Sequence, residues 1–138
     1  MSLLFFSEGI DFVLPHPRKT SSWIKSVIKK EKKTLTSINY IFCNDPFLLP
    51  INQEYLNHDT LTDIVTFDYS LKSELKGEIY ISIERVKENA LTFNRPFDEE
   101  LHRVIIHGVL HLAGYKDKSK AQKAEMRKKE EAYLSLRK

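Results

Sequence analysis

Two histidines four residues apart, followed by an acid six residues later, are the residues of this sequence best suited to chemistry. They are His107, His111 and Asp117, in the segment HGVLHLAGYKD. Side chains four apart on a helix project from one face, so both imidazoles would point the same way. Gly114 allows the chain to leave the helix with a positive φ and to bring Asp117 over the two rings. Zinc accepts two imidazole nitrogens and a carboxylate oxygen together with a water molecule, so we expect about one Zn²⁺ per chain here.

A competing interpretation is a pair of core histidines bonded to backbone carbonyls, with Asp117 on the surface. The apolar residues around them indicate a buried helix, where an imidazole without a partner is costly. The spacing H-x-x-x-H-x-x-G-x-x-D also follows the metzincin pattern, with Asp in place of the third His. Gly108 stands where a peptidase of that class has its catalytic Glu, and glycine cannot move a proton. A metal site is favoured, and a peptidase would need a carboxylate from elsewhere in the chain.

Strand and helix patterns alternate along the chain and must position these residues. We predict an α/β fold: a single compact domain over 1–138, with a mixed, mostly four-stranded sheet packed with helices and a metzincin-like metal helix. Apolar alternation and β-branched runs predict strands, and apolar residues at helical spacing predict helices. The expected strands are 2–10, 35–45, 62–70 and 77–83, and the expected helices are 20–34, 46–57, 85–94, 98–114 and 118–138.

Composition and charge restrict the class of protein. The single cysteine, Cys43, excludes an internal disulfide framework and lies in an apolar stretch, which favours an inert buried thiol in a reducing cytoplasm. The first residues form neither a signal peptide nor a membrane span, so we expect no membrane association. Residues 116–138 contain nine Lys and Arg against four acids. This basic tail suits a polyanion such as RNA, although a solvated helix that contacts nothing is the alternative.

Three blocks of the sequence resemble the YbeY endoribonucleases, also called rRNA maturation factors. The first block, HGVLHLAGYKD, is similar to the family signature H-G-x-L-H-L-x-G-Y-D-H. A second block, NQEYLNHDTLTDIVTF, is similar to N-x-E-Y-R followed by T-D-V-L-S-F, and a third is the Gly-acid-Ile motif. The matching residues are His107, Gly108, Leu110, His111, Leu112, Gly114 and Tyr115; Asn52, Glu54, Tyr55, Asp59, Thr62, Asp63 and Phe67; and Gly77, Glu78 and Ile79.

The resemblance implies a zinc-dependent, single-strand-type endoribonuclease that acts in ribosome biogenesis. Its expected reaction is phosphodiester cleavage during rRNA processing and maturation of the 16S rRNA 3′ end, with rRNA and the small ribosomal subunit as partners. We expect a cytoplasmic protein with no organic cofactor. A zinc-bound water would be the catalytic agent, because the sequence identifies no general base. The further catalytic candidates are His58, Asp63 and Glu78, and the RNA-binding candidates are Lys116, Lys118, Lys120 and Lys123.

Two positions depart from the family pattern. Asp117 replaces the third histidine, and Lys116 replaces the acid before it. The arginine that follows Tyr in the family, regarded as important for RNA cleavage, is Leu56 here. Leucine can neither clamp a phosphate nor stabilise charge that develops on it, and His58 is the nearest candidate to take over. The alternative function is therefore a non-catalytic or weakly catalytic ribosome- or RNA-binding assembly factor with a structural metal.

Overall fold

The computed structural model describes residues 2–56 and 62–137, and these residues form four strands and five helices. Strands and helices alternate along most of the chain, as the sequence patterns predict. In chain order the elements are β1 (Ser2–Ser7), α1 (Pro17–Lys30), β2 (Thr34–Cys43), α2 (Asp45–Leu56), β3 (Ile64–Asp68), β4 (Glu74–Ser82), α3 (Ile83–Thr92), α4 (Phe97–Leu112) and α5 (Lys120–Leu134).

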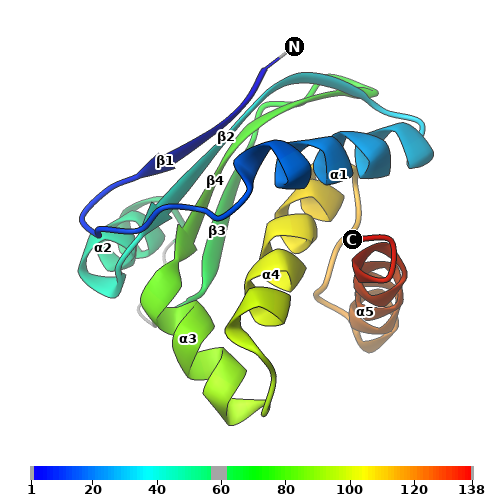
Figure 1. Cartoon of the computed structure of the whole chain (residues 1–138). Helices are drawn as coiled ribbons and strands as arrows, with labels where there is room; N and C mark the ends of the chain where they lie inside the picture. The colour runs from blue at the N-terminus through cyan, green and yellow to red at the C-terminus, as the bar shows by residue number, and fades with distance from the viewer. Residues whose placement is uncertain (1, 57–61, 138) are drawn as a thin grey trace.

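The sheet is mixed and has the strand order β1-β2-β4-β3. β1, β2 and β4 run parallel, and β3 pairs antiparallel with β4. Figure 1 shows α1 and α4 on the same side of this sheet, with α5 next to α4. On the other side, Leu48 of α2 packs in a cluster with Cys43 and Val65. The predicted fold class, an α/β domain with a four-stranded mixed sheet packed with helices, is confirmed.

α4 is the central helix of the domain and carries the candidate ligands. Its apolar side chains are buried on nearly every side, which matches their all-round distribution in the sequence. Gly108 lies at a close approach of α4 to the sheet: a Cβ atom there would be 2.9 Å from two side-chain atoms of Ile79. Position 108 therefore faces the sheet. A glutamate at position 108 would collide with Ile79 of β4, so there is a steric reason against a peptidase base at this position.

Two helices begin at other residues than the sequence patterns predicted, because the residues at their N-terminal ends determine the start. α1 begins at Pro17, earlier than the predicted residue 20, because proline is well suited to the first helical position. α5 begins at Lys120, after a capping box in which Ser119 and Gln122 exchange hydrogen bonds. The fourth strand starts at Glu74 rather than residue 77. Within the described ranges, the apolar stretches of the helices are all too short to span a membrane.

Candidate metal centre

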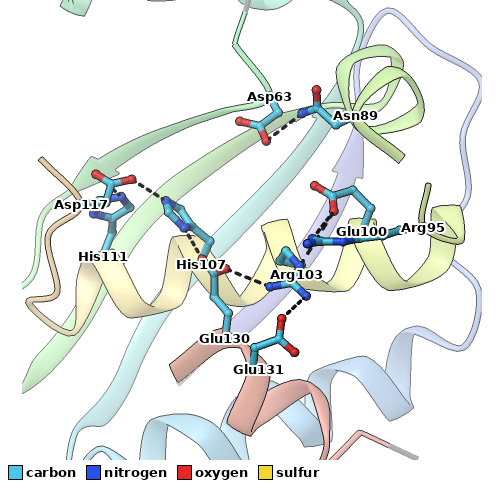
Figure 2. A network of polar contacts seen from close by, with 10 residues as sticks. All are labelled: Asp63, Asn89, Arg95, Glu100, Arg103, His107, His111, Asp117, Glu130 and Glu131. Atoms are coloured by element: carbon cyan, nitrogen blue, oxygen red, sulfur yellow. Dashed lines mark hydrogen bonds and ion pairs between the residues drawn. The ribbon is translucent and has the colours of Figure 1, made fainter. Parts of the chain in front are cut away.

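The three expected ligands come together at the C-terminal end of α4. His107 and His111 lie one turn apart, with ring centroids 4.6 Å from each other in an edge-to-face arrangement. Asp117 Oδ2 is 3.2 Å from His107 Nε2, and its Oδ1 is 3.6 Å from His111 Nε2. One donor atom from each residue falls within 4.8 Å of the other two. Figure 2 shows the carboxylate of Asp117 directed at the two imidazoles.

The loop after α4 places Asp117 by means of a tight turn and an anchor. Gly114 has φ 108°, a conformation that favours glycine, and the Tyr115 amide donates to the Leu110 carbonyl at 3.0 Å. The Tyr115 hydroxyl then donates to Glu31 Oε1 at 2.7 Å. Glu31 lies just beyond the end of α1, so a second helix holds the loop that carries the third ligand. The positive φ of Gly114 and the hydrogen bonds of Tyr115 are the physical reason why the chain leaves the helix at the predicted place.

Glu130 of α5 orients the first histidine. His107 Nδ1 donates to Glu130 Oε2 at 2.6 Å, which leaves Nε2 directed at His111 and Asp117. Metal-ligating histidines usually have such a carboxylate on the ring nitrogen that does not bind the metal. Two nitrogens and one oxygen, with one imidazole already oriented, are a donor set that fits a divalent metal ion. Sequence reasoning missed Glu130, because its place in a charged helix gave no signal.

Arg103 completes the polar network behind the ligands. Its Nη1 lies 3.4 Å from Glu130 Oε1, and its Nη2 lies 2.6 Å from Glu131 Oε1. A third carboxylate, Glu100, is 3.9 Å from its Nε. The side chains of Arg103 and Glu130 are about nine-tenths buried, so the guanidinium compensates charge that would otherwise be costly inside the protein. Figure 2 shows the chain of contacts that runs from the ligands through Glu130 to Arg103.

The two histidines differ in their protonation. Burial acts to lower the pKa of His107, but the carboxylates of Glu130, Asp117 and Asp63 outweigh it and hold that pKa above the ordinary value. The pKa of His111 is lowered, first by burial and then by the charge of His107. His111 therefore stays neutral more readily, and a neutral imidazole is the form that binds a metal.

A cleft of about 830 Å³ opens in front of the ligands. Asp63, at the head of β3, lines it and lies across from the histidines (Figure 2). Asn89 Nδ2 donates to Asp63 Oδ2 at 3.3 Å, and burial raises the pKa of this carboxyl group. The structure thus brings this sequence candidate into the same cleft as the expected ligands.

Two of the four expected RNA-binding lysines line this cleft. They are Lys118 and Lys123, and a further cation that sequence reasoning missed, Arg127, lines it as well. Lys116 instead borders a separate hollow beside Glu31. Lys120 is absent from the described lining of the cleft. The basic tail is therefore divided among different surfaces.

Glu78, another of the catalytic candidates, does not lie beside the expected metal ligands. Glu78 lies on β4 between Gly77, where a Cβ atom would meet Leu112 of α4, and Ile79, which belongs to the main core. Alternation along a strand directs Glu78 to the opposite sheet face, where it accepts a hydrogen bond from the Tyr69 hydroxyl at 3.4 Å. The geometry gives Glu78 no place beside the ligands. His58 lies outside the residues that the structure describes.

Fold and site together define a single-domain α/β protein with a His-His-Asp cluster at the end of its central helix. The family model described as "Endoribonuclease YbeY" matches residues 13–137. The chain therefore belongs to the endoribonuclease YbeY family, and the resemblance seen in its motifs is confirmed, together with the prediction of a YbeY-type endoribonuclease.

The similarity extends over nearly the whole chain. The endoribonuclease YbeY of Flavobacterium psychrophilum is 57% identical over 134 residues, which are 97% of this chain and 96% of that protein. The endoribonuclease YbeY of Bacteroides fragilis is 44% identical over 138 residues, with coverage of 100% and 99%. A solution structure of a Thermotoga maritima protein is similar with a TM-score of 0.69 and 30% identity, and covers 97% of this chain and 87% of that one.

Proposed function

We propose that this chain is a zinc-dependent endoribonuclease of ribosome biogenesis, which acts on rRNA and the small ribosomal subunit in the cytoplasm and contributes to 16S rRNA 3′-end maturation. Residues 1–138 would act as one hydrolase domain. The observation that carries the proposal is the convergence of three donor atoms, one of them oriented by Glu130, at the wall of an open cleft that cations also line. Membership of the endoribonuclease YbeY family supports RNA as the substrate.

His107, His111 and Asp117 would hold the metal. When bound, zinc supplies Lewis-acid chemistry that polarises a phosphodiester and makes a water molecule more acidic. The carboxylate of Asp117 neutralises one unit of the metal's charge, and Glu130 fixes the ring of His107. Asp63 lies across the cleft with a pKa that burial raises, and it is a candidate to hold a proton near the scissile phosphate.

The first experiment determines the metal content of the purified protein by elemental analysis. We expect about one zinc per chain, a strong decrease in His107→Ala and a smaller decrease in Asp117→Ala. His102→Gln is the matched control on the same helix, because the ring of His102 contacts Thr20 and the Asp98 carbonyl instead of the cluster. Full zinc retention in His107→Ala would refute the metal site.

The second experiment measures cleavage of a single-stranded RNA by the zinc-loaded protein and by His111→Ala. The proposal requires cleavage by the first and a strong loss in the second. Equal cleavage by both proteins would assign the activity to a contaminant or to another site.

A second candidate function is a ribosome- or RNA-binding assembly factor with a structural metal and weak or no catalysis. The observation that favours it is Leu56 at the position of the family arginine, because leucine cannot stabilise charge on a phosphate. Zinc binding and RNA binding without cleavage by the wild-type protein would support this alternative over the endoribonuclease.

A further inference from the structure

The basic residues of α5 point in three directions. Lys123 and Arg127 line the cleft. Lys129 instead binds Glu31 Oε2 at 3.2 Å and lies over the ring of Tyr115 at 5.6 Å from the centroid. Lys128 is exposed and does not belong to the described lining of the cleft. The positive charge of this helix therefore consists of separate groups with different neighbours.

Arg127 faces the cleft without a carboxylate partner among the described residues. Its natural helical partners are Glu130 and Glu131, three and four residues further along α5. Both are already engaged, since Arg103 lies 3.4 Å from Glu130 Oε1 and 2.6 Å from Glu131 Oε1. Glu130 also accepts from His107. The Arg127 guanidinium is left with its donors available to a ligand.

The register of α5 places this arginine in the same cleft as the candidate metal ligands. Met126 and Glu130 are buried and fix the inner strip of the helix, and Glu130 ties that strip to His107. Lys123 and Arg127 are four residues apart and so lie about 40° from each other around the helix axis. They border the inner strip, exposed to solvent and lining the cleft.

We propose that Arg127, together with Lys123, forms the phosphate-binding wall of this cleft and seats the backbone of single-stranded RNA beside the metal ligands. The inference rests on the proposed function for the identity of the polymer. Arginine presents a planar set of donors that matches phosphate oxygens in a bidentate manner, and lysine adds a point charge one turn away. Arg127 is a positioning residue, which acts through the phosphate that it holds.

The test is the salt dependence of RNA binding. Binding of a short, fluorescein-labelled single-stranded RNA to the zinc-loaded protein is measured by anisotropy at several salt concentrations, and gels verify that the RNA is intact. Each phosphate contact contributes a slope of about −0.7 in log affinity against log salt for a single strand, or about 2.6-fold between 50 and 200 mM. Arg127→Ala and Lys123→Ala should each make the slope shallower by about 0.7, so that the loss of affinity between 50 and 200 mM salt is about 2.6-fold smaller than in the wild type. In the double variant this loss should be about 7-fold smaller.

Lys128→Ala is the matched control, because it removes the same charge from the adjacent position of the same helix without a described contact to the cleft. Its salt slope should equal that of the wild type, and Arg127→Lys should keep the slope with weaker binding. Zinc content and thermal unfolding should be unchanged in all four single variants. The inference is overturned by an unchanged slope in Arg127→Ala, by an equal decrease in Lys128→Ala, or by a wild-type protein that does not bind the RNA.

These outcomes separate the inference from the proposed endoribonuclease. Salt-dependent binding that Arg127→Ala weakens, without cleavage by the zinc-loaded wild type, would refute the catalytic function and keep the phosphate-binding wall. Cleavage with an unchanged slope in Arg127→Ala would do the reverse. In a cleaving protein, Arg127→Ala should raise KM with little change in kcat, since a contact to a phosphate other than the scissile one contributes equally to the ground state and the transition state.

Discussion

Replacement of Glu130 tests whether its contact with His107 strengthens metal binding at the candidate centre. Glu130 does not belong to the expected ligand set, yet its Oε2 lies 2.6 Å from His107 Nδ1. The substitution Glu130→Ala would leave the ring of His107 free to rotate and to place its proton on either nitrogen. It would also remove one of the carboxylates that surround the Arg103 guanidinium, at 3.4 Å from its Nη1.

The expected magnitude follows from these contacts. Loss of a carboxylate that orients a ligating histidine weakens metal affinity about 10- to 100-fold, which corresponds to about 1.4–2.8 kcal/mol. Glu130→Ala should lie at the upper end of that range, because it removes both the acceptor and the charge. Glu130→Gln retains an oxygen that can accept from Nδ1 and should lie at the lower end.

The measurement is zinc affinity by competition with a chromogenic chelator. Glu131→Gln is the control: it removes the adjacent carboxylate of the same helix, which binds Arg103 at 2.6 Å and makes no described contact with His107. Its zinc affinity should stay within about twofold of the wild type, because only the contact with His107 concerns the metal. Equal affinities in Glu130→Ala and the wild type, or equal losses in the Glu130 and Glu131 variants, would refute the reasoning.

Three further predictions concern the fold. Gly108→Ala would place a Cβ atom 2.9 Å from the side chain of Ile79, so urea denaturation should show about 1–3 kcal/mol lower stability; an unchanged midpoint would contradict this packing. Burial and then the charge of Asp45 raise the pKa of Cys43 to about 12, so a thiol reagent should modify it only after unfolding, and fast labelling of the native protein would count against the buried thiol. Burial lowers the pKa of His102, so as the pH falls the unfolded chain binds a proton before the folded chain does, and the free energy of unfolding should decrease below about pH 6.5. In urea titrations of chelator-treated protein, the free energy of unfolding of His102→Gln should depend less on pH than that of the wild type. The same pH dependence in both proteins would refute this.

The expected ligands and the fold class were accessible from the sequence because both depend on local patterns. The four-residue spacing of His107 and His111 fixes their common face on any helix, and Gly114 allows the turn that brings Asp117 back. The family motifs then added the substrate class, whereas the strand order β1-β2-β4-β3 was not predicted. Each of these signals lies within one short segment of the sequence, so no long-range packing had to be known.

The rest of the site depends on packing between distant segments. Glu130 and Arg127 join the cleft only because α5 docks against α4, and an acid or base in a charged helix carries no mark of the face it will present. Glu78 depends on packing in the same way. Its motif left open a place near the ligands or a place in solvent, and strand alternation directs it away from α4; a shift of one residue in register would have reversed that result.

Charge balance explains why one helix can serve both the metal and the RNA. A divalent ion bound at the cluster would be compensated by Asp117 directly and by Glu130 through His107. Arg103 meanwhile lies beside both Glu130, which is buried, and Glu131, which is exposed, so both of these acids of α5 are already paired with a guanidinium. Lys123 and Arg127 line the cleft and are exposed to solvent, and no acid in the described part of α5 forms an ion pair with them that would neutralise their charge. Because Glu130 points inward to His107 while Lys123 and Arg127 line the cleft, α5 can stabilise a cationic centre and still attract a polyanion.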